Sequence, residues 1–213
     1  QSSVKPGKTF VYNFTARNAG THFYHTHGSK HGDEVSQFDM GLSGPFIIEP
    51  RDYDRPDKEY VMMLSAWRLN DDGSNQAEAE VLGAGHDHAL QGAAAYGVFT
   101  INGKVFPEIP ALQVKGGEKV RLRLINASSQ EIHPMHLHGH NFKIVATDGN
   151  PVPKAAQITK DTIPLMPGER VDVEFIADNP GAWVFHCHHL HHATDMAVAF
   201  LYEGFAPCCL NNP

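Results

Sequence analysis

The stretch from His186 to Met196 constrains this chain more than any other. It reads HCHHLHHATDM, with five histidines, one cysteine and one methionine. A cysteine thiolate, imidazoles and a thioether together form the ligand set of a blue copper site. On a β-strand, residues i and i+2 point to one face and residue i+1 points to the other. If Cys187 faces one metal, His186 and His188 therefore face a second one behind it.

Histidine is frequent along the whole chain of 213 residues, with 15 histidines against 17 lysines and arginines together. A tag would place them in one run, whereas these lie in spaced pairs, mostly within apolar, β-like segments. The further groups are HTH at 25–27, HDH at 86–88 and HPMHLHGH at 133–140. Burying so many imidazoles without a metal would cost much desolvation free energy. The pattern therefore predicts metal sites, although the glycine-rich surroundings of His86 and His88 favour a plain loop pair.

Charge and apolar runs exclude several classes of protein. The formal net charge is −7, so no basic surface points to nucleic acid or to an anionic membrane. No run of about 18 apolar residues is present to span a bilayer, and the first residues do not form a signal peptide. Three cysteines cannot all pair. Adjacent Cys208 and Cys209 would close a strained ring, so we expect free thiols or an intermolecular bridge there.

Short strands separated by Pro/Gly turns recur along the chain, and no sustained helical period is present. Alternation or β-forming composition predicts strands within 10–15, 21–27, 46–48, 60–67, 98–107, 119–125, 136–146, 171–175, 182–187 and 196–202. Asn102-Gly103 predicts a hairpin turn, and residues 77–82 favour one or two helical turns. This pattern predicts an all-β Greek-key sandwich.

An internal repeat suggests how the chain divides. Residues 5–27 contain a Pro-Gly turn, an alternating strand, a second turn and a strand with His-x-His, and residues 167–188 repeat that order. We therefore expect 1–50 to be the C-terminal half of a first domain and 51–57 to be a linker. Residues 58–205 would form a complete second domain with a long loop at 70–95, and 206–213 a tail.

These motifs resemble those of the multicopper oxidases, of the laccase and copper-resistance type. The matching segments are Gly20-Thr21-x-Phe23-Tyr24-His25-Thr26-His27 with GLSGP at 41–45, HPxHLHGH at 133–140, and HCHxxxH at 186–192. The resemblance covers most of the chain apart from 70–95. It implies cupredoxin-like domains, one complete and one half, that bind up to four coppers of types 1, 2 and 3.

The resemblance also implies a role for each matching residue. His133, Cys187 and His192 would hold the type 1 copper, with Met196 as the candidate axial ligand. His136 would bind the type 2 copper. The type 3 pair would be held by His25, His27, His138, His186 and His188. Cys187 is covalently bonded between His186 and His188, so an electron would have a short bonded path from the first site to the second. His192, Cys187, His186 and His188 are accordingly the predicted catalytic residues.

One departure from the family pattern affects the type 1 site. The family places its axial residue ten positions after the cysteine, which is Ala197 here, whereas Met196 is nine after it. Either Cys187, His192 and Met196 form the site with azurin-like spacing, or His191 is the ligand in a loop shorter by one residue. We favour His192, because Cys-x4-His is the family spacing. A methionine ligand would lower the reduction potential relative to leucine or phenylalanine.

A second departure is the lack of the family's earlier His-x-His-Gly motif, which supplies one type 2 and one type 3 ligand. The chain is therefore expected to be a fragment, or to receive these ligands from another chain. Too few residues separate Pro50 from the strand at Val120 for an intervening domain of about 100 residues. The two-domain form of the family, a homotrimer with the trinuclear site between subunits, is the expected analogue.

The resulting hypothesis is a laccase-like oxidase. It would take single electrons from phenolic, aromatic or metal-ion donors at a type 1 copper near the surface, entering at His192, and would reduce O2 to water. By resemblance it would be secreted or periplasmic. The alternative is a non-catalytic copper-binding, resistance or electron-transfer protein. A copper nitrite reductase is disfavoured, because those lack the His-Cys-His pattern of a type 3 pair.

Overall fold

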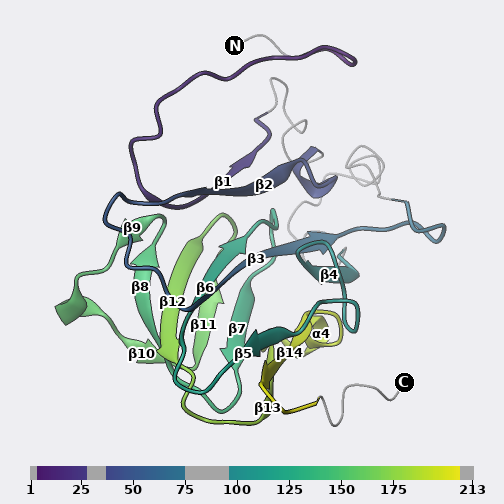
Figure 1. Ribbon diagram of the computed structural model, residues 1–213. Helices are drawn as coiled ribbons and strands as arrows, with labels where there is room; N and C mark the ends of the chain where they lie inside the picture. Colours follow the sequence, from purple (N-terminus) through teal and green to yellow (C-terminus); the bar gives the residue numbers. More distant parts are fainter. Residues whose placement is uncertain (1–3, 28–36, 75–95, 207–213) are drawn as a thin grey trace.

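The computed structural model describes residues 4–27, 37–74 and 96–206 (Figure 1). The helical turns predicted at 77–82, the pair His86 and His88, and the two cysteines Cys208 and Cys209 lie outside these residues. No helix in the described ranges is long and apolar enough to cross a membrane.

Two sheets form the body of the molecule (Figure 1). The seven-stranded sheet runs β10-β8-β12-β6-β3-β4, and β9 pairs with β8. Its strands are β3 (Lys58–Trp67), β4 (Val98–Ile101), β6 (Lys119–Asn126), β8 (Phe142–Thr147), β9 (Asn150–Pro151), β10 (Thr159–Lys160) and β12 (Arg170–Ile176). The five-stranded sheet runs β11-β7-β13-β14-β5, with β5 (Leu112–Val114), β7 (His133–Leu137), β11 (Thr162–Leu165), β13 (Ala182–Cys187) and β14 (Ala197–Tyr202).

One hydrophobic core lies between these sheets. It joins Leu122 on β6 and Val173 on β12 to Leu137, Phe185 and Phe200 on the second sheet, all almost fully buried. On β3, for example, the apolar residues Met62, Leu64 and Ala66 are buried and alternate with half-buried neighbours, as a half-buried strand requires. The predicted all-β, cupredoxin-like fold is confirmed. The few helical segments are short, among them η2 (Lys154–Ala156) and α4 (Leu190–Ala193).

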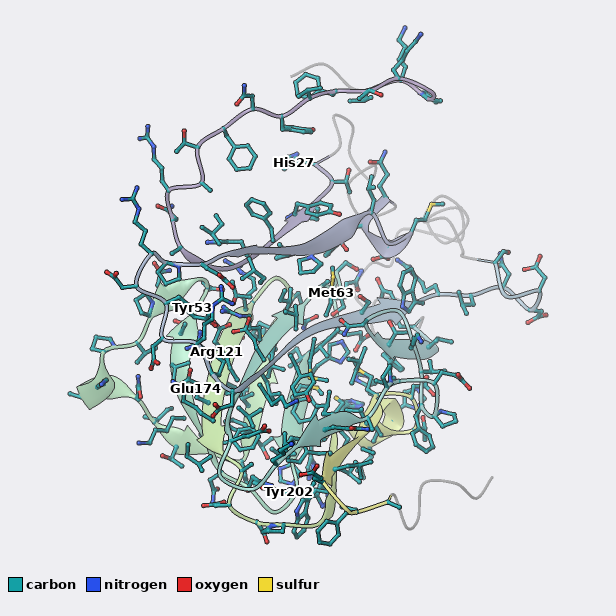
Figure 2. All side chains as sticks on the ribbon, viewed as in Figure 1. His27, Tyr53, Met63, Arg121, Glu174 and Tyr202 are labelled. Carbon is teal, nitrogen blue, oxygen red and sulfur yellow. The ribbon has the colours of Figure 1, made fainter. Side chains whose placement is uncertain are left out.

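A smaller two-stranded sheet, formed by β1 (Gly20–His25) and β2 (Ser43–Ile48), lies beside the large sheet. Thr21 is buried where it donates to Asp172 of β12 at 2.6 Å and accepts from Arg123 of β6 at 2.7 Å. Tyr53, after β2, accepts from Arg121 at 2.7 Å, and Figure 2 shows these two residues with Glu174 along one side of the body. Buried charged and hydroxyl groups therefore attach the N-terminal residues to the large sheet.

Close approach of two backbones explains one glycine of this contact. A Cβ at Gly20 would lie 2.1 Å from the carbonyl oxygen of Gly149, and its φ of 142° is one that L side chains rarely adopt. The glycine of the Gly-Thr motif is thus required by packing against the turn between β8 and β9.

Two predicted strands were wrong. Residues 10–15 are not a strand, and Phe10, Tyr12 and Phe14 are exposed, because no described strand pairs with this segment and an unpaired strand is unstable in water. After β4, the predicted turn forms, with positive φ at Asn102 and Gly103. The second arm of that hairpin does not form beyond one bridge between Ile101 and Lys104.

Candidate metal centre

Neighbouring strands β7 and β13 place their histidines on two opposite faces. His133, Met135 and Leu137 point into the core on β7, whereas His136 and His138 are partly or fully exposed. On β13, Cys187 is buried and His186 is half-buried. The register pairs His186 with His136. The period of two that the sequence suggested therefore separates an inner cluster from an outer one.

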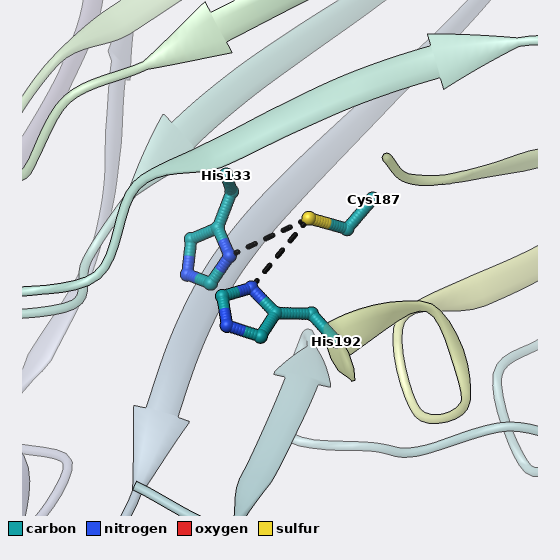
Figure 3. A group of neighbouring side chains, drawn as sticks. All are labelled: His133, Cys187 and His192. Atoms are coloured by element: carbon teal, nitrogen blue, oxygen red, sulfur yellow. Dashed lines mark hydrogen bonds between the residues drawn. The ribbon is translucent and has the colours of Figure 1, made fainter. Parts of the chain in front are cut away.

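The inner cluster consists of His133, Cys187 and His192, which are at most 2% exposed. The Cys187 Sγ lies 3.9 Å from Nδ1 of His133 and 3.6 Å from Nδ1 of His192, and Figure 3 shows both rings turned toward the sulfur. His192 comes from α4, one turn of helix directly after β13. The prediction that His192 rather than His191 joins Cys187 agrees with this geometry.

These distances fit a metal ion bound by all three side chains. Bonds of about 2.3 Å to a thiolate and about 2.0 Å to an imidazole, at the roughly 120° angle of a trigonal site, would separate sulfur from nitrogen by about 3.7 Å. The observed separations lie on either side of that value. The far nitrogens also fit, because His133 Nε2 lies 3.4 Å from the Ser128 hydroxyl and His192 Nε2 lies 3.6 Å from a Glu131 carboxylate oxygen. The Ser128 hydroxyl donates its own proton to Asn126 Oδ1 or to the Glu131 carbonyl. Both contacts therefore favour protons on Nε2, which leaves the Nδ1 lone pairs for the metal.

Burial controls the charges of the inner cluster. Desolvation, and then the nearby His192 and His189, lower the pKa of His133 to about 3, and desolvation lowers the pKa of His192 to about 4. Desolvation also raises the pKa of the Cys187 thiol to about 11, although the backbone N–H of His189 opposes this. Without a metal, all three side chains are therefore neutral at pH 7. Binding a cation as a thiolate complex would release the thiol proton.

The ring of His192 is enclosed on both faces, which corrects one expectation. The sequence predicted His192 near the surface, but it is 2% exposed. Its ring stacks on Phe99 with centroids 3.7 Å apart and on His189 with centroids 4.1 Å apart. Phe99 is buried, whereas His189 is exposed. The helical turn of α4 folds His192 inward, so His189 lies between it and solvent.

The outer cluster consists of His136, His138 and His186. The Nε2 atoms of His138 and His186 are 2.9 Å apart. Nδ1 of His136 contacts the carbonyl of Asp161 at 2.9 Å, and Nδ1 of His186 contacts that of Cys187 at 2.8 Å. A carbonyl only accepts, so these Nδ1 atoms carry the protons and the Nε2 lone pairs face the shared centre. Desolvation, followed by neighbouring histidines, lowers the pKa of His138, and desolvation also lowers that of His186.

The remaining predicted ligands lie at different distances from these clusters. The exposed ring of His188 is 5.5 Å from that of His136 and 5.7 Å from that of His186, next to the outer cluster. His25 ends β1, and Figure 2 shows His27 on the N-terminal segment, away from the large sandwich. Neither belongs to the two clusters. Met196 is fully buried, and its carbonyl accepts the Cys187 N–H at 3.0 Å. Their roles as ligands stay predictions.

Three residues that contact the inner cluster were not predicted from the sequence. Phe99 covers one face of His192, Ser128 faces His133, and Glu131 places a buried carboxylate beside His192. Burial raises the pKa of Glu131, and its Oε1 has no hydrogen-bond partner among the residues that the structure describes. His140, the last histidine of the motif at 133–140, is buried, with Nε2 2.7 Å from the Tyr202 hydroxyl.

Comparison with family models identifies the chain. A multicopper oxidase model matches residues 81–204, which include both clusters, and a second multicopper oxidase model matches residues 1–53. The chain belongs to the multicopper oxidase family. Members of this family bind copper, and the two His/Cys clusters are consistent with copper sites. Copper is therefore the metal that the inner cluster, with its trigonal arrangement of one sulfur and two nitrogens, is suited to hold.

Three similar multicopper oxidases are each matched over only part of their length. The multicopper oxidase MmcO of Mycobacterium tuberculosis is 37% identical over 103 residues, 48% of this chain and 19% of that protein. Laccase-1 of Fomitopsis schrenkii is 32% identical over 174 residues, 74% of this chain and 28% of that protein. Among solved structures, the blue copper oxidase of Nitrosomonas europaea has a TM-score of 0.76 and 34% identity, covering 95% of this chain and 62% of that one. The chain thus spans under two thirds of these relatives.

Proposed function

We propose that this chain forms part of a laccase-like multicopper oxidase that takes one electron at a time from phenolic, aromatic or metal-ion donors. The observation that supports this most strongly is the pair of clusters back to back on β13, with Cys187 in one and His186 in the other. Copper bound at both clusters would accept these electrons at the inner site and supply them to O2, which is reduced to water at the outer site.

The proposed copper ligands fall into two groups. His133, Cys187 and His192, with Met196 as axial ligand, would hold a type 1 copper in a dry pocket. His136 would bind a type 2 copper, and His25, His27, His138, His186 and His188 would bind a type 3 pair. The backbone would carry electrons from Cys187 to His186 and His188, because these two histidines are bonded to Cys187 in the chain. The exposed outer face would leave room for O2 and for proton supply from water.

The outer site needs further histidines, and we propose that they come from an N-terminal segment outside this sequence or from a neighbouring subunit. A two-domain homotrimer, secreted or periplasmic, would provide the latter arrangement. The exposed aromatic residues Phe10, Tyr12 and Phe14 support a partner on this side of the molecule. Sedimentation of the copper-loaded protein would distinguish a trimer from a monomer.

The direct test is to load the purified protein with Cu(II) and to measure copper per chain, the blue absorption band and O2 uptake with a phenolic dye. We expect an intense blue band and O2 consumption without accumulation of H2O2. Full copper loading without O2 consumption would reject the oxidase.

A second candidate is a copper protein that stores copper or transfers electrons without reducing O2. The inner cluster favours it, because that cluster is complete and buried within the described residues, whereas the outer one is partly exposed. His136→Ala would then leave every measured activity unchanged. A loss of O2 uptake with a retained blue band would reject this alternative.

A further inference from the structure

His138 is held differently from the other two histidines of the outer cluster. In both His136 and His186, Nδ1 contacts a backbone carbonyl, which fixes the ring. Among the described residues, Nδ1 of His138 has no hydrogen-bond partner, and its Nε2 lies 2.9 Å from Nε2 of His186. The position of the His138 ring therefore depends on its own backbone, at the turn that follows β7.

Three hydrogen bonds hold the backbone of this turn. The N–H of His138 donates to the carbonyl of Val184 on β13 at 3.0 Å. The carbonyl of His138 contacts Nδ1 of His140 at 3.0 Å, and the carbonyl of Gly139 accepts from Nδ2 of Asn179 at 2.9 Å. These contacts fix the peptide planes on both sides of Gly139, and with them the direction in which the His138 side chain leaves the backbone.

His140 is a buried polar residue among aromatic rings. It is 5% exposed, and its ring centroid lies 5.3 Å from that of Phe200, 5.4 Å from that of Phe175 and 5.9 Å from that of Trp183. A phenylalanine would fill this space without desolvating two ring nitrogens, which costs free energy unless both are paired. This environment indicates that the imidazole is used for its nitrogens rather than for its shape.

Both nitrogens of His140 are paired, and their partners fix which one carries the proton. A carbonyl only accepts, so Nδ1 donates to the carbonyl of His138. Nε2 then accepts from the hydroxyl of Tyr202 at 2.7 Å, and the Tyr202 oxygen accepts the N–H of Asn179 at 3.2 Å. Hydrogen bonds aligned in this way strengthen one another in a buried setting. The chain of bonds therefore keeps the Nδ1 proton of His140 directed at His138.

We propose that His140 is a positioning residue of the outer metal site. It holds the carbonyl of His138 so that Nε2 of His138 faces the centre shared with His136 and His186. This inference rests on the proposed function, since it takes the outer cluster to be a copper site. His140 does not touch the metal and acts only through the backbone of His138. Loss of its Nδ1–H donor should therefore weaken metal binding at a different residue, on the exposed face of the sheet.

The test uses Cu(II) alone, added to the full chain carrying Cys187→Ser, so that the inner cluster supplies no thiolate. The affinity is measured by competition with a chelator, and the bound Cu(II) is characterised by EPR. His140→Phe fills the space between the aromatic rings but has no donor. We expect it to weaken Cu(II) binding about 10–100-fold, as loss of outer-shell contacts does at metal sites, and to change the EPR spectrum. Unchanged affinity and spectrum would overturn the proposal.

Two further variants separate positioning from packing, and they decide the question if His140→Phe does not fold. An asparagine side chain places its amide nitrogen near the Nδ1 position of a histidine, whereas a glutamine reaches as far as Nε2. His140→Asn should therefore keep most of the Cu(II) affinity, and His140→Gln should lose it. Equal losses in the two would reject the positioning role. Phe175→Leu, a packing control from the same group of rings, should lower the Tm but leave the affinity and the EPR spectrum unchanged.

Failure of the wider oxidase hypothesis gives a different result. His138→Ala, in the same Cys187→Ser background, reports whether Cu(II) binds at the outer cluster. An affinity that does not respond to His138→Ala would reject the outer copper site, and with it both proposals. An affinity that responds to His138→Ala but not to His140→Phe would reject the positioning role alone.

Discussion

The inner and outer histidine clusters lie on opposite faces of the same two strands, yet they differ in almost every physical respect. The inner one is buried, and it consists of His133, Cys187 and His192 within the two-sheet body. The outer one, around His138 and His186, is open to solvent. A buried site must be complete within its own fold, because unpaired buried ligands are costly. An exposed site can lack some of its ligands at little cost to stability, because water solvates the histidines that are present.

The largest expected effect is that of Cys187→Ser, which breaks the inner cluster alone. Serine keeps the shape, but its hydroxyl does not supply the thiolate of a blue copper site. We expect the blue band to disappear and O2 uptake to fall more than about a hundredfold, since even outer-shell changes at metal sites cost 10–100-fold. Copper analysis should show the outer cluster still loaded. A retained blue band would contradict the ligand assignment.

His138→Ala breaks the outer cluster alone. The side chain is exposed, so we expect the free energy of unfolding of the copper-free protein to change by less than about 0.5 kcal/mol. The blue band should remain while O2 uptake is lost. The informative control is His191→Ala, an exposed histidine outside both clusters, which should keep both signals. Loss of the blue band in His191→Ala would revive the alternative in which His191 is the ligand.

The acid sensitivity of the copper-free protein should come mainly from the inner cluster. The folded pKa values of His133 and His192, about 3 and about 4, lie below the unfolded value near 6.5. Below pH 6.5 the unfolded chain binds protons that the folded protein excludes, so stability falls as pH falls toward these folded values. Each histidine should cost about 2 kcal/mol at pH 5.

Urea unfolding between pH 7 and pH 4 measures this sensitivity. His133→Gln should flatten the pH dependence, whereas His138→Ala should change it much less. An equally steep loss of stability in His133→Gln would show that the acid sensitivity originates elsewhere. Above pH 9 the raised pKa of Cys187, about 11, has a parallel effect, because the unfolded thiol ionises first and stability falls again.

The smallest effect is expected from Met196→Leu, which sharpens the description of the inner cluster. Met196 is fully buried, and leucine is close in volume, so the fold should tolerate the change. Removing a thioether ligand raises the potential of a type 1 copper. Redox titration of the blue band should therefore show a modest positive shift. An unchanged reduction potential would mean that Met196 packs in the core and does not bind the copper.

The sequence by itself determined the β fold and the separation of the two clusters. Alternation on a strand is a local property, so His186-Cys187-His188 required two opposite faces before any tertiary contact was known. The family spacing of Cys187 and His192 likewise indicated His192 as the partner of the sulfur, but the helical turn of α4 that brings it there was not predicted.

Only the tertiary structure decided what surrounds these residues. The stack of His192 on Phe99 from another strand and the carboxylate of Glu131 beside His192 depend on contacts between segments far apart in sequence. The apolar alternation of residues 10–15 could not reveal that no described strand lies beside them. A local pattern specifies which face of a strand is apolar, but the partners of that face are set by how distant segments pack.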